Sequence, residues 1–297
     1  WRADDVLVHA LPLYHVHGLF VAAHGALRAN ASMRWLDSFE PHAALWELTE
    51  GGGTVFMGVP TFYTRLLQAT DVPNLSHVRL FTSGSAPLPA RVHRDFQERT
   101  GQAILERYGM TEVGIVLSNP YDGERRPGAV GFPLPGVDAR VVDPGADGVG
   151  ELQIRGGSVF AGYHNRPDAT AAAFNGDWMR TGDYAFVDED GYIHLVGRRS
   201  DLILFGGLNI YPAEVEAVLI EQPGVRAVAV FGLPDDDLGE VPAAALVGDG
   251  LDIDAIRQAA SAQLSGFKVP RRFVVVDALP RNTMGKVQKK RLREQYS

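Results

Sequence analysis

The sequence contains no cysteine, which excludes disulfide bonds, thiol nucleophiles and cysteine metal sites. It also has no uninterrupted apolar run long enough to cross a bilayer, so no membrane-spanning segment is expected. Positive charge is not in excess either. The formal net charge is −8 at pH 7, so the overall field attracts neither nucleic acid nor an anionic membrane. These absences fit a cytoplasmic protein whose phosphate ligands, if any, are held by a few local groups.

The first residues lack the features of a chain start. Trp1 is not an initiator methionine, and no signal-peptide pattern follows it. A buried strand is expected almost at once, from Val6. We therefore expect residue 1 to lie in the middle of a longer polypeptide. The 297 residues are 45% hydrophobic, which is enough for about two domains with a sizeable core.

Residues 1–127 alternate short apolar runs with helical stretches, which predicts an α/β layer with a mostly parallel sheet. Strands are expected at Val6–Leu11, Thr54–Val59 and Val78–Ser83, and helices at His42–Glu50, Thr61–Ala69 and Pro89–Thr100.

Residues 128–197 carry closely spaced Gly, Pro and Asp turns, which predict a β-rich subdomain. Strands are expected there at Ala139–Val142, Glu151–Arg155 and Tyr192–Val196. A hinge is predicted at 198–201, followed by a small α+β domain at 202–297. Its expected strands are Asp201–Leu204, Ala227–Phe231 and Phe273–Val276, and its expected helices are Pro212–Ile220 and Ile253–Leu264.

Two polar signatures follow apolar runs in the first part of the chain. Phe81–Pro87 comes between a predicted strand and a helix, where ligands of α/β sheets gather. Arg107–Glu112 offers an aromatic ring, a hydroxyl and a carboxylate, which suit base stacking, phosphate binding and a Mg²⁺ ligand. The structural alternatives are an ordinary strand–helix turn and a helix cap.

Two more signatures lie further along. Asp183 could accept hydrogen bonds from both ribose hydroxyls, although a β-turn aspartate is the commoner reading. Arg198 could hold the ribose or a phosphate from a strand end. Lys286 follows a Gly-containing turn near the C terminus, where a lysine suits a transferring phosphate or carboxylate. The usual fate of a single lysine is, however, a solvated surface.

Taken together, these stretches resemble the adenylate-forming (ANL) superfamily, which includes acyl-CoA synthetases, luciferases and nonribosomal-peptide adenylation domains. The resemblance runs from one end of the chain to the other. It rests on Ser83–Leu88 (SGSAPL), Glu106–Glu112 (ERYGMTE), Gly162–Phe174 (GYHNRPDATAAAF), Trp178–Ile203, Gly206–Glu216 (GGLNIYPAEVE) and Pro280–Lys289 (PRNTMGKVQK).

The resemblance implies an ATP-dependent acid:CoA ligase that works through an acyl-adenylate. The fold it implies is a large domain, made of an α/β layer and a β-rich subdomain, with a small mobile C-terminal α+β domain. The implied ligands are ATP, Mg²⁺ and coenzyme A. Lys286, Thr111 and Glu112 would be catalytic, with Thr111 on the α-phosphate, Glu112 on Mg²⁺ and Lys286 bridging the substrate carboxylate and the α-phosphate.

The nucleotide and CoA contacts implied by the resemblance are more numerous. Tyr108 would stack on adenine, and Asp183 and Arg198 would hold the ribose. The pantetheine path would pass Gly206 and Gly207. The remaining residues expected at the nucleotide are Ser83, Gly84, Ser85, Ala86, Glu106, Arg107, Gly109 and Met110.

The superfamily's Ser/Thr/Gly-rich phosphate loop is missing from the sequence, and it should lie shortly upstream of Trp1. Such a loop cradles the β- and γ-phosphates. We therefore expect that a missing N-terminal segment completes the enzyme and that this stretch alone binds ATP poorly. A truncated, non-catalytic nucleotide- or CoA-binding relative is the alternative of a different class.

Two stretches narrow the choice of acid substrate, because they are similar to malonyl-CoA synthetases: Ala10–Leu19 and Met57–Leu66. In that family, an arginine matching Arg65 would pair with the second carboxylate of malonate or methylmalonate, and His17 and Ser83 would line the same pocket. Arg65 could instead be a helix-surface arginine. The alternative substrates are medium-chain or aromatic acids. The sequence does not indicate an oligomeric state.

Overall fold

The computed structural model describes residues 1–69, 72–282 and 285–297. Contacts within the chain divide it into two compact units, each of which is described by itself. The first contains residues 1–142, 152–181 and 187–195, and the second contains residues 143–151, 182–186 and 196–297. The domain boundaries expected from the sequence stay predictions, because compactness alone does not define them.

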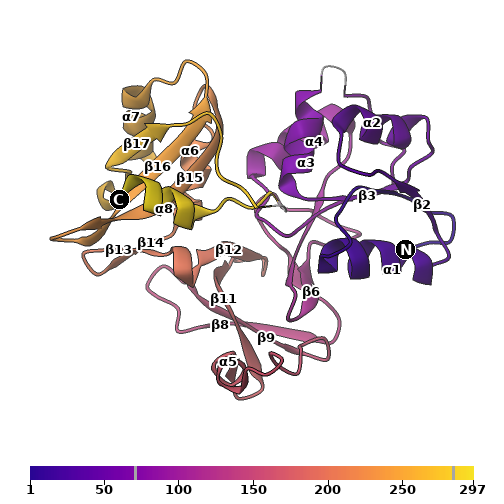
Figure 1. The fold of residues 1–297 in the computed structure, drawn as a ribbon, viewed down its shortest axis with the longest axis horizontal. Coiled ribbons are helices and arrows are strands. Elements are labelled where there is room, and N and C mark those ends of the chain that lie inside the picture. Colours follow the sequence, from indigo (N-terminus) through magenta and orange to yellow (C-terminus); the bar gives the residue numbers. More distant parts are fainter. Residues whose placement is uncertain (70–71, 283–284) are drawn as a thin grey trace. The chain divides into compact units, whose positions relative to one another are not determined.

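The first sheet has seven strands in the order β2-β1-β3-β4-β5-β6-β7 (Figure 1). The five strands from β2 to β5 pair in parallel, while β6 and β7 add antiparallel strands at one edge. In sheet order, the strands are Ser32–Trp35, Val6–His9, Val55–Gly58, Leu80–Ser83, Leu105–Met110, Gly114–Ser118 and Phe132–Pro133.

Three helices bury a common core against this sheet: α2 (Pro41–Thr49), α3 (Pro60–Gln68) and α4 (Ala90–Thr100) (Figure 1). Tyr63 of α3 and Phe96 of α4 are fully buried and pack edge to face with ring centroids 5.2 Å apart. This arrangement confirms the predicted α/β layer, because α2, α3 and α4 lie where the sequence pattern placed helices.

Several elements of this part were not predicted from the sequence. The π-helix η1 (His17–Ala23) continues into α1 (His24–Arg28), and β2 forms the edge of the sheet. Strand β5 is also absent from the predicted strands, and it pairs with β4 and β6. Its polar residues alternate between two faces that are both covered, so its sequence lacks the apolar run typical of a buried strand.

The second sheet confirms the strand-rich character predicted after residue 127. Its order is β10-β11-β9-β8, and β12 also pairs with β11. The helix α5 (Pro167–Ala172) precedes β10. The strands β8 to β12 are Val137–Val142, Gly150–Gly156, Phe174–Asn175, Trp178–Val187 and Ile193–Arg198.

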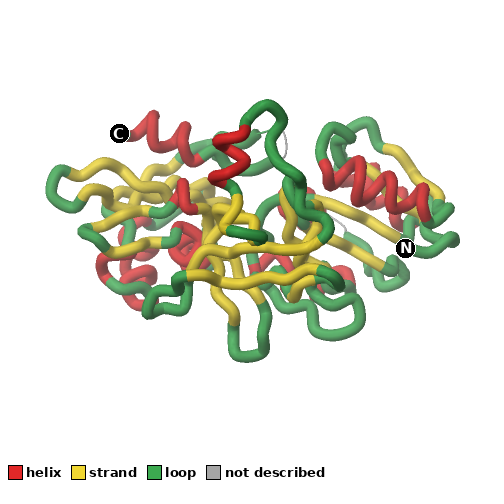
Figure 2. Tube along the Cα trace, turned by 90° about the horizontal axis from the view of Figure 1, so that it is seen from below, coloured by secondary structure: helices red, strands yellow, loops and turns green. Residues whose placement is uncertain are grey.

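The third sheet has the order β14-β13-β16-β15, with β17 parallel to β16. Helices α6 and α7 share one apolar cluster with it, and α8 shares another, so the sheet is covered on both faces. Figure 2 shows α8, next to the C terminus, lying along these strands. The strands β13 to β17 are Ile203–Phe205, Leu208–Ile210, Val225–Asp235, Gly239–Gly248 and Arg272–Val275, and the helices α6 to α8 are Pro212–Leu219, Ile253–Gln263 and Lys289–Tyr296.

Two short 3₁₀ turns complete the second unit, η2 (Arg199–Asp201) and η3 (Gly266–Lys268). The turn η2 occupies the predicted hinge and takes Asp201 out of the strand that the sequence predicted there. No helix among the described residues is long and apolar enough to cross a bilayer.

Candidate functional site

The predicted ligand-binding stretches of the first unit meet at one edge of the first sheet. Strands β3, β4 and β5 are parallel, and Ser83 stands opposite both Gly58 and Glu106. The carboxyl ends of these strands therefore lie side by side, and the segment 83–86 follows β4 at that edge. Parallel pairing thus brings the first two sequence signatures together.

The backbone after β4 runs close to its neighbours. A Cβ on Gly84 would lie 3.4 Å from the carbonyl oxygen of Arg107 and 3.5 Å from Cε1 of His17. Ser85 has a left-handed φ of 71°, and its Oγ lies 3.3 Å from Nδ1 of His17. A non-glycine residue pays strain for such a φ, so the surrounding contacts must hold the turn in shape. Ala86 follows, half-buried.

Arg107 points into the sheet edge. Its guanidinium donates a 2.9 Å hydrogen bond to Oγ1 of Thr82, while its buried Nε has no partner among the described residues. Burial lowers the pKa of Arg107 to about 10. A buried cation without a carboxylate partner is costly in a folded protein, and such a group at the end of parallel strands indicates a place for an anion.

Two further buried polar atoms belong to residues at this edge of the sheet. Nε2 of His17 and Oγ of Ser83 have no hydrogen-bond partner within the part of the chain that is described. Burial and the nearby Arg107 lower the pKa of His17 to about 3, so its ring is neutral at physiological pH. The Arg107 cation and the neutral His17 ring thus lie close enough to interact, yet neither satisfies the other.

Glu106, the neighbour of Arg107, faces the other side of β5. It is 3% exposed, and its Oε1 accepts a 2.9 Å hydrogen bond from the amide of Leu88. Burial raises the pKa of Glu106 to about 8, against the weaker opposing effect of the Leu88 amide. The side chain therefore holds its proton near neutral pH and ties the segment before α4 to β5.

Strand β5 ends in a tight hairpin with β6 that carries the predicted adenine and phosphate contacts. A Cβ on Gly109 would lie 2.0 Å from the carbonyl oxygen of Gly114, so only glycine fits there. The ring of Tyr108 is buried, and its hydroxyl lies 3.8 Å from the sulfur of Met110. Thr111 is exposed on the turn.

Glu112 completes this hairpin turn and is fixed by a residue that the sequence reading did not single out. Its Oε1 accepts a 2.9 Å hydrogen bond from the hydroxyl of Tyr163, and its carbonyl accepts one of 2.7 Å from the amide of Phe160. Tyr163 belongs to the GYHNRPDAT stretch that carried the family resemblance, which is the one signal by which it could have been found.

Arg65, the predicted partner of a second carboxylate, lies on the exposed side of α3, whose Tyr63 and Leu66 are buried. None of the contacts described for this chain joins it to Arg107, His17 or Ser83. Its assignment to the substrate stays a prediction.

In the second unit, four charged groups gather. Arg198, the last residue of β12, forms a 3.2 Å ion pair with Asp183 of β11. Burial lowers the pKa of Lys286, as does Arg198, while Asp183 and Asp201 oppose the shift. The structure thus brings Lys286, Asp183 and Arg198 together, as a shared role in one site requires.

The backbone around Lys286 is a closed turn. The Lys286 amide donates a 2.9 Å hydrogen bond to the side chain of Asn282, whose own amide donates to the Lys286 carbonyl. Arg281 pairs with Val287 through a β-bridge and donates to the carbonyl of Gly285. Thr283 and Met284, which belong to the predicted motif, lie outside the described residues.

Gly206 and Gly207 form the turn between β13 and β14, with φ angles of 55° and 83°. The amide of Gly206 donates a 2.7 Å hydrogen bond to the carbonyl of Leu238, and a Cβ on Gly207 would meet nothing within 4 Å. Left-handed φ at both positions explains the glycine pair.

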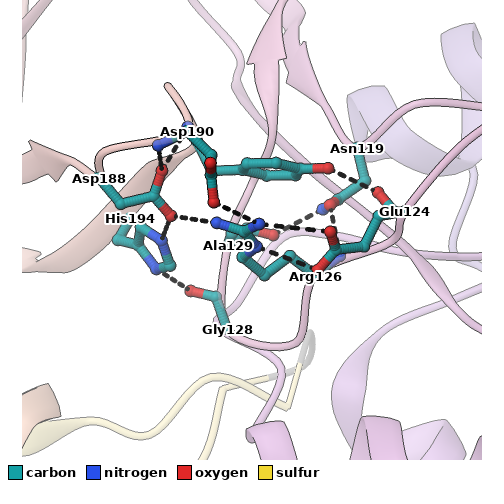
Figure 3. Close-up of polar contacts among 9 residues, drawn as sticks. Asn119, Glu124, Arg126, Gly128, Ala129, Asp188, Asp190 and His194 are labelled. Carbon is teal, nitrogen blue, oxygen red and sulfur yellow. Dashed lines mark hydrogen bonds and ion pairs between the residues drawn. The ribbon is translucent and has the colours of Figure 1, made fainter.

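A polar network that the sequence reading missed braces the segment after β6 (Figure 3). The guanidinium of Arg126 contacts three carboxylates: it lies 2.7 Å from Asp188, 2.9 Å from Asp190 and 3.2 Å from Glu124. Nε2 of His194 lies 2.8 Å from the Asp188 carboxylate, and its Nδ1 lies 3.2 Å from the carbonyl oxygen of Gly128; both oxygens are acceptors.

Asn119 connects this network to the strand that carries the site. Its side-chain amide donates to the carbonyls of Glu106 and Ala129 at 3.1 and 2.6 Å, and its Oδ1 accepts from the amide of Arg126 (Figure 3). The network therefore holds the chain that follows β6 against β5. It consists of polar contacts between distant residues, which the apolar pattern of a sequence does not indicate.

Comparison of this chain with known protein families identifies the family to which it belongs. The family described as "AMP-binding enzyme" matches residues 1–164, and the "AMP-binding enzyme C-terminal domain" matches residues 214–286. The first match covers more than half of the chain, so the chain belongs to the AMP-binding enzyme family, the ANL superfamily that its sequence resembles.

Individual relatives include CoA ligases for different acids. A malonate–CoA ligase of Arabidopsis thaliana is 37% identical, with 99% of this chain and 54% of that protein covered. A sulfoacetate–CoA ligase of Cupriavidus necator is 39% identical, with 98% and 59% covered. The crystal structure of ATP-bound MatB from Rhodopseudomonas palustris has a TM-score of 0.95 and 48% identity, with 99% and 61% covered. The chain thus spans little more than half the length of these relatives.

The Arg126 network should matter for stability. We expect Arg126→Ala to lower the Tm clearly, because three carboxylates lose their common cation and the segment after β6 loses its brace. Differential scanning calorimetry would measure the change. Arg155→Ala, which breaks the exposed pair with Asp138, is the matched control and should change the Tm little. Equal Tm values for the two variants would contradict the bracing role.

Buried Glu106 should make stability depend on pH. Its pKa is raised from 4.5 to about 8 in the folded chain, so the folded state binds more protons than the unfolded state within that window. The free energy of unfolding should therefore fall as pH rises through it. Glu106→Gln removes this ionisable group. Between pH 5 and 8, the free energy of unfolding of the variant should therefore rise relative to that of the wild type by roughly a few kcal/mol.

Urea denaturation at several pH values would test this difference. Glu98→Gln, at an exposed position on α4, is the control and should follow the wild type throughout. A Glu106→Gln variant whose pH dependence also follows the wild type would show that the carboxyl group is ionised in the folded protein.

Proposed function

We propose that this chain forms the greater part of an AMP-forming acid:CoA ligase. Its reaction would convert malonate or methylmalonate, ATP and CoA to the acyl-CoA, AMP and pyrophosphate through an acyl-adenylate. The observation that carries the choice of acid is the largely buried guanidinium of Arg107, whose Nε has no described partner, beside the unpaired Nε2 of His17 at the carboxyl edge of the first sheet. A cytoplasmic location belongs to the same proposal.

A small acid with a second anionic group fits this polar set. The planar guanidinium of Arg107 can pair with a carboxylate through two N–H groups, and neutral His17 and Ser83 can add hydrogen bonds. A fatty acid would instead bury apolar chain against these groups and leave them unpaired. Relatives named for malonate and for sulfoacetate support an acid with a distal anion and do not distinguish between the two.

Glu112 is proposed as the protein ligand of Mg²⁺. The described residues contain no group of three His, Asp or Glu side chains that could hold a metal alone. A single carboxylate nevertheless fits Mg²⁺, which commonly binds one or two carboxylates together with substrate phosphates. When bound, the ion would supply charge neutralisation at the leaving pyrophosphate.

The remaining residues are proposed to bind and orient the substrates. Thr111, exposed on its turn, would donate to the α-phosphate, and the Tyr108 ring would contact adenine. Asp183, held by Arg198, would accept from the ribose hydroxyls. Lys286 would bring positive charge to the carboxylate that attacks the α-phosphate. Gly206 and Gly207 would leave the backbone open to the pantetheine arm of CoA.

The acid is tested by ATP–pyrophosphate exchange, using the full-length protein with malonate, methylmalonate, octanoate and benzoate. Exchange that responds to malonate or methylmalonate but not to octanoate is expected. A response to octanoate or benzoate alone would replace the dicarboxylate with a medium-chain or aromatic acid. ATP binding without exchange for any acid would favour a non-catalytic binding protein.

Lys286→Ala should separate the two half-reactions. We expect adenylate formation to fall by roughly two to three orders of magnitude, because the charge that offsets anion repulsion is lost. Thioester formation from a supplied acyl-adenylate should stay largely intact. Lys290→Ala, at an exposed position on α8, is the control and should change neither rate. Equal losses in both half-reactions would contradict the role of Lys286.

Arg107→Met should weaken malonate use specifically. Removing the buried cation should raise the KM for malonate roughly 30-fold or more, as truncation of a buried charge pair does, while the KM for ATP changes little. Arg65→Ala is the informative comparison. If Arg65→Ala raises the malonate KM and Arg107→Met does not, the second carboxylate binds at α3, as the sequence predicted.

A further inference from the structure

Glu112 has a dedicated hydrogen-bond donor. The hydroxyl of Tyr163 lies 2.9 Å from its Oε1, while no described partner occupies Oε2. A carboxylate oxygen accepts, so the phenol hydroxyl is the donor. The contact joins residues 51 positions apart in the chain, so tertiary folding alone creates it.

The Tyr163 side chain is held ready for this contact. Its amide donates a 2.9 Å hydrogen bond to Oγ1 of Thr170 in α5, and its ring packs against Phe160 with centroids 4.8 Å apart. A Cβ on Gly162 would lie 2.5 Å from the Thr170 methyl group, so the backbone before Tyr163 is pressed against α5. Phe160 in turn donates its amide to the carbonyl of Glu112.

We propose that Tyr163 is a positioning residue for Glu112: its hydroxyl occupies one carboxylate oxygen and directs the other to the metal ion that accompanies ATP. The inference rests on the proposed function of Glu112 as the Mg²⁺ ligand. Tyr163 is neither among the site residues expected from the sequence nor among the proposed ligands of the substrates and the metal.

The physical reason is orientation. A carboxylate on an exposed hairpin turn can rotate, and Mg²⁺ requires near-ideal octahedral geometry. A donor on Oε1 restricts that rotation and makes one-oxygen binding through Oε2 the favoured geometry. Outer hydrogen bonds to metal ligands commonly contribute 10- to 100-fold to metal affinity.

The test uses full-length protein saturated with ATP and follows Mn²⁺ binding by electron paramagnetic resonance, a readout independent of turnover. Tyr163→Phe keeps the ring that packs on Phe160 and removes only the hydroxyl. We expect it to bind Mn²⁺ about 10- to 100-fold more weakly than the wild type. Thr170→Val, which frees the Tyr163 amide, should weaken binding in the same direction.

Two measurements separate positioning from a structural role. Tyr163→Phe should bind ATP normally when EDTA removes the metal, and excess Mg²⁺ should restore its kcat in adenylate formation. Tyr121→Phe is the matched control, because its similarly exposed hydroxyl also bonds a charged side chain, that of Arg79. It should match the wild type throughout.

Each outcome has one meaning. If Glu112→Gln weakens Mn²⁺ binding and Tyr163→Phe changes it less than about twofold, the positioning role is wrong while the metal ligand stands. If Tyr163→Phe loses as much affinity for ATP without metal as it loses for Mn²⁺, the inference is also overturned. If Glu112→Gln leaves Mn²⁺ binding unchanged, the proposed metal ligand fails first, and the positioning role fails with it.

Discussion

The parallel pairing of β4 with β5 is the constraint on which the first unit depends. It sets Ser83 opposite Glu106, so the segments that follow the two strands leave the sheet at the same edge. His17, Ser85 and Arg107 then come within contact of one backbone, that of Gly84. Without this register, the two most informative sequence stretches would be remote from each other.

Strand β5 also shows how one sheet serves two purposes. Successive side chains point to opposite faces, so Glu106 and Arg107 enter different environments. Glu106 meets the Leu88 amide among apolar neighbours, where its protonated form adds to the packing of the fold. Arg107 stays charged at the other face, with only Thr82 and Met57 as described partners. The first arrangement costs folding free energy as the pH rises toward 8, whereas the second stores an unsatisfied charge that a bound anion can relieve.

Charge is handled differently in the two units. Around Arg126, cation and carboxylates are matched, which suits a permanent brace. Around Lys286, the basic groups Lys286 and Arg198 share one neighbourhood with Asp183 and Asp201, and burial works against the lysine charge. A lysine that is partly desolvated in this way gains more from an incoming anion than a solvated one would. The two clusters therefore differ in how completely their charges are matched.

The sequence by itself determined the class of fold, most strands and helices, and the membership of the family, because these follow from local apolar periods and from contiguous motifs. It also named Ser83, Glu112, Asp183, Arg198 and Lys286 as site residues. It could not reveal that β5 is a strand, that Nε of Arg107 has no partner among the described residues, or that Tyr163 and Arg126 reach residues about 50 or more positions away. Those facts depend on which side of a strand a residue faces and on which segments the sheet brings together, and only the tertiary structure decides both.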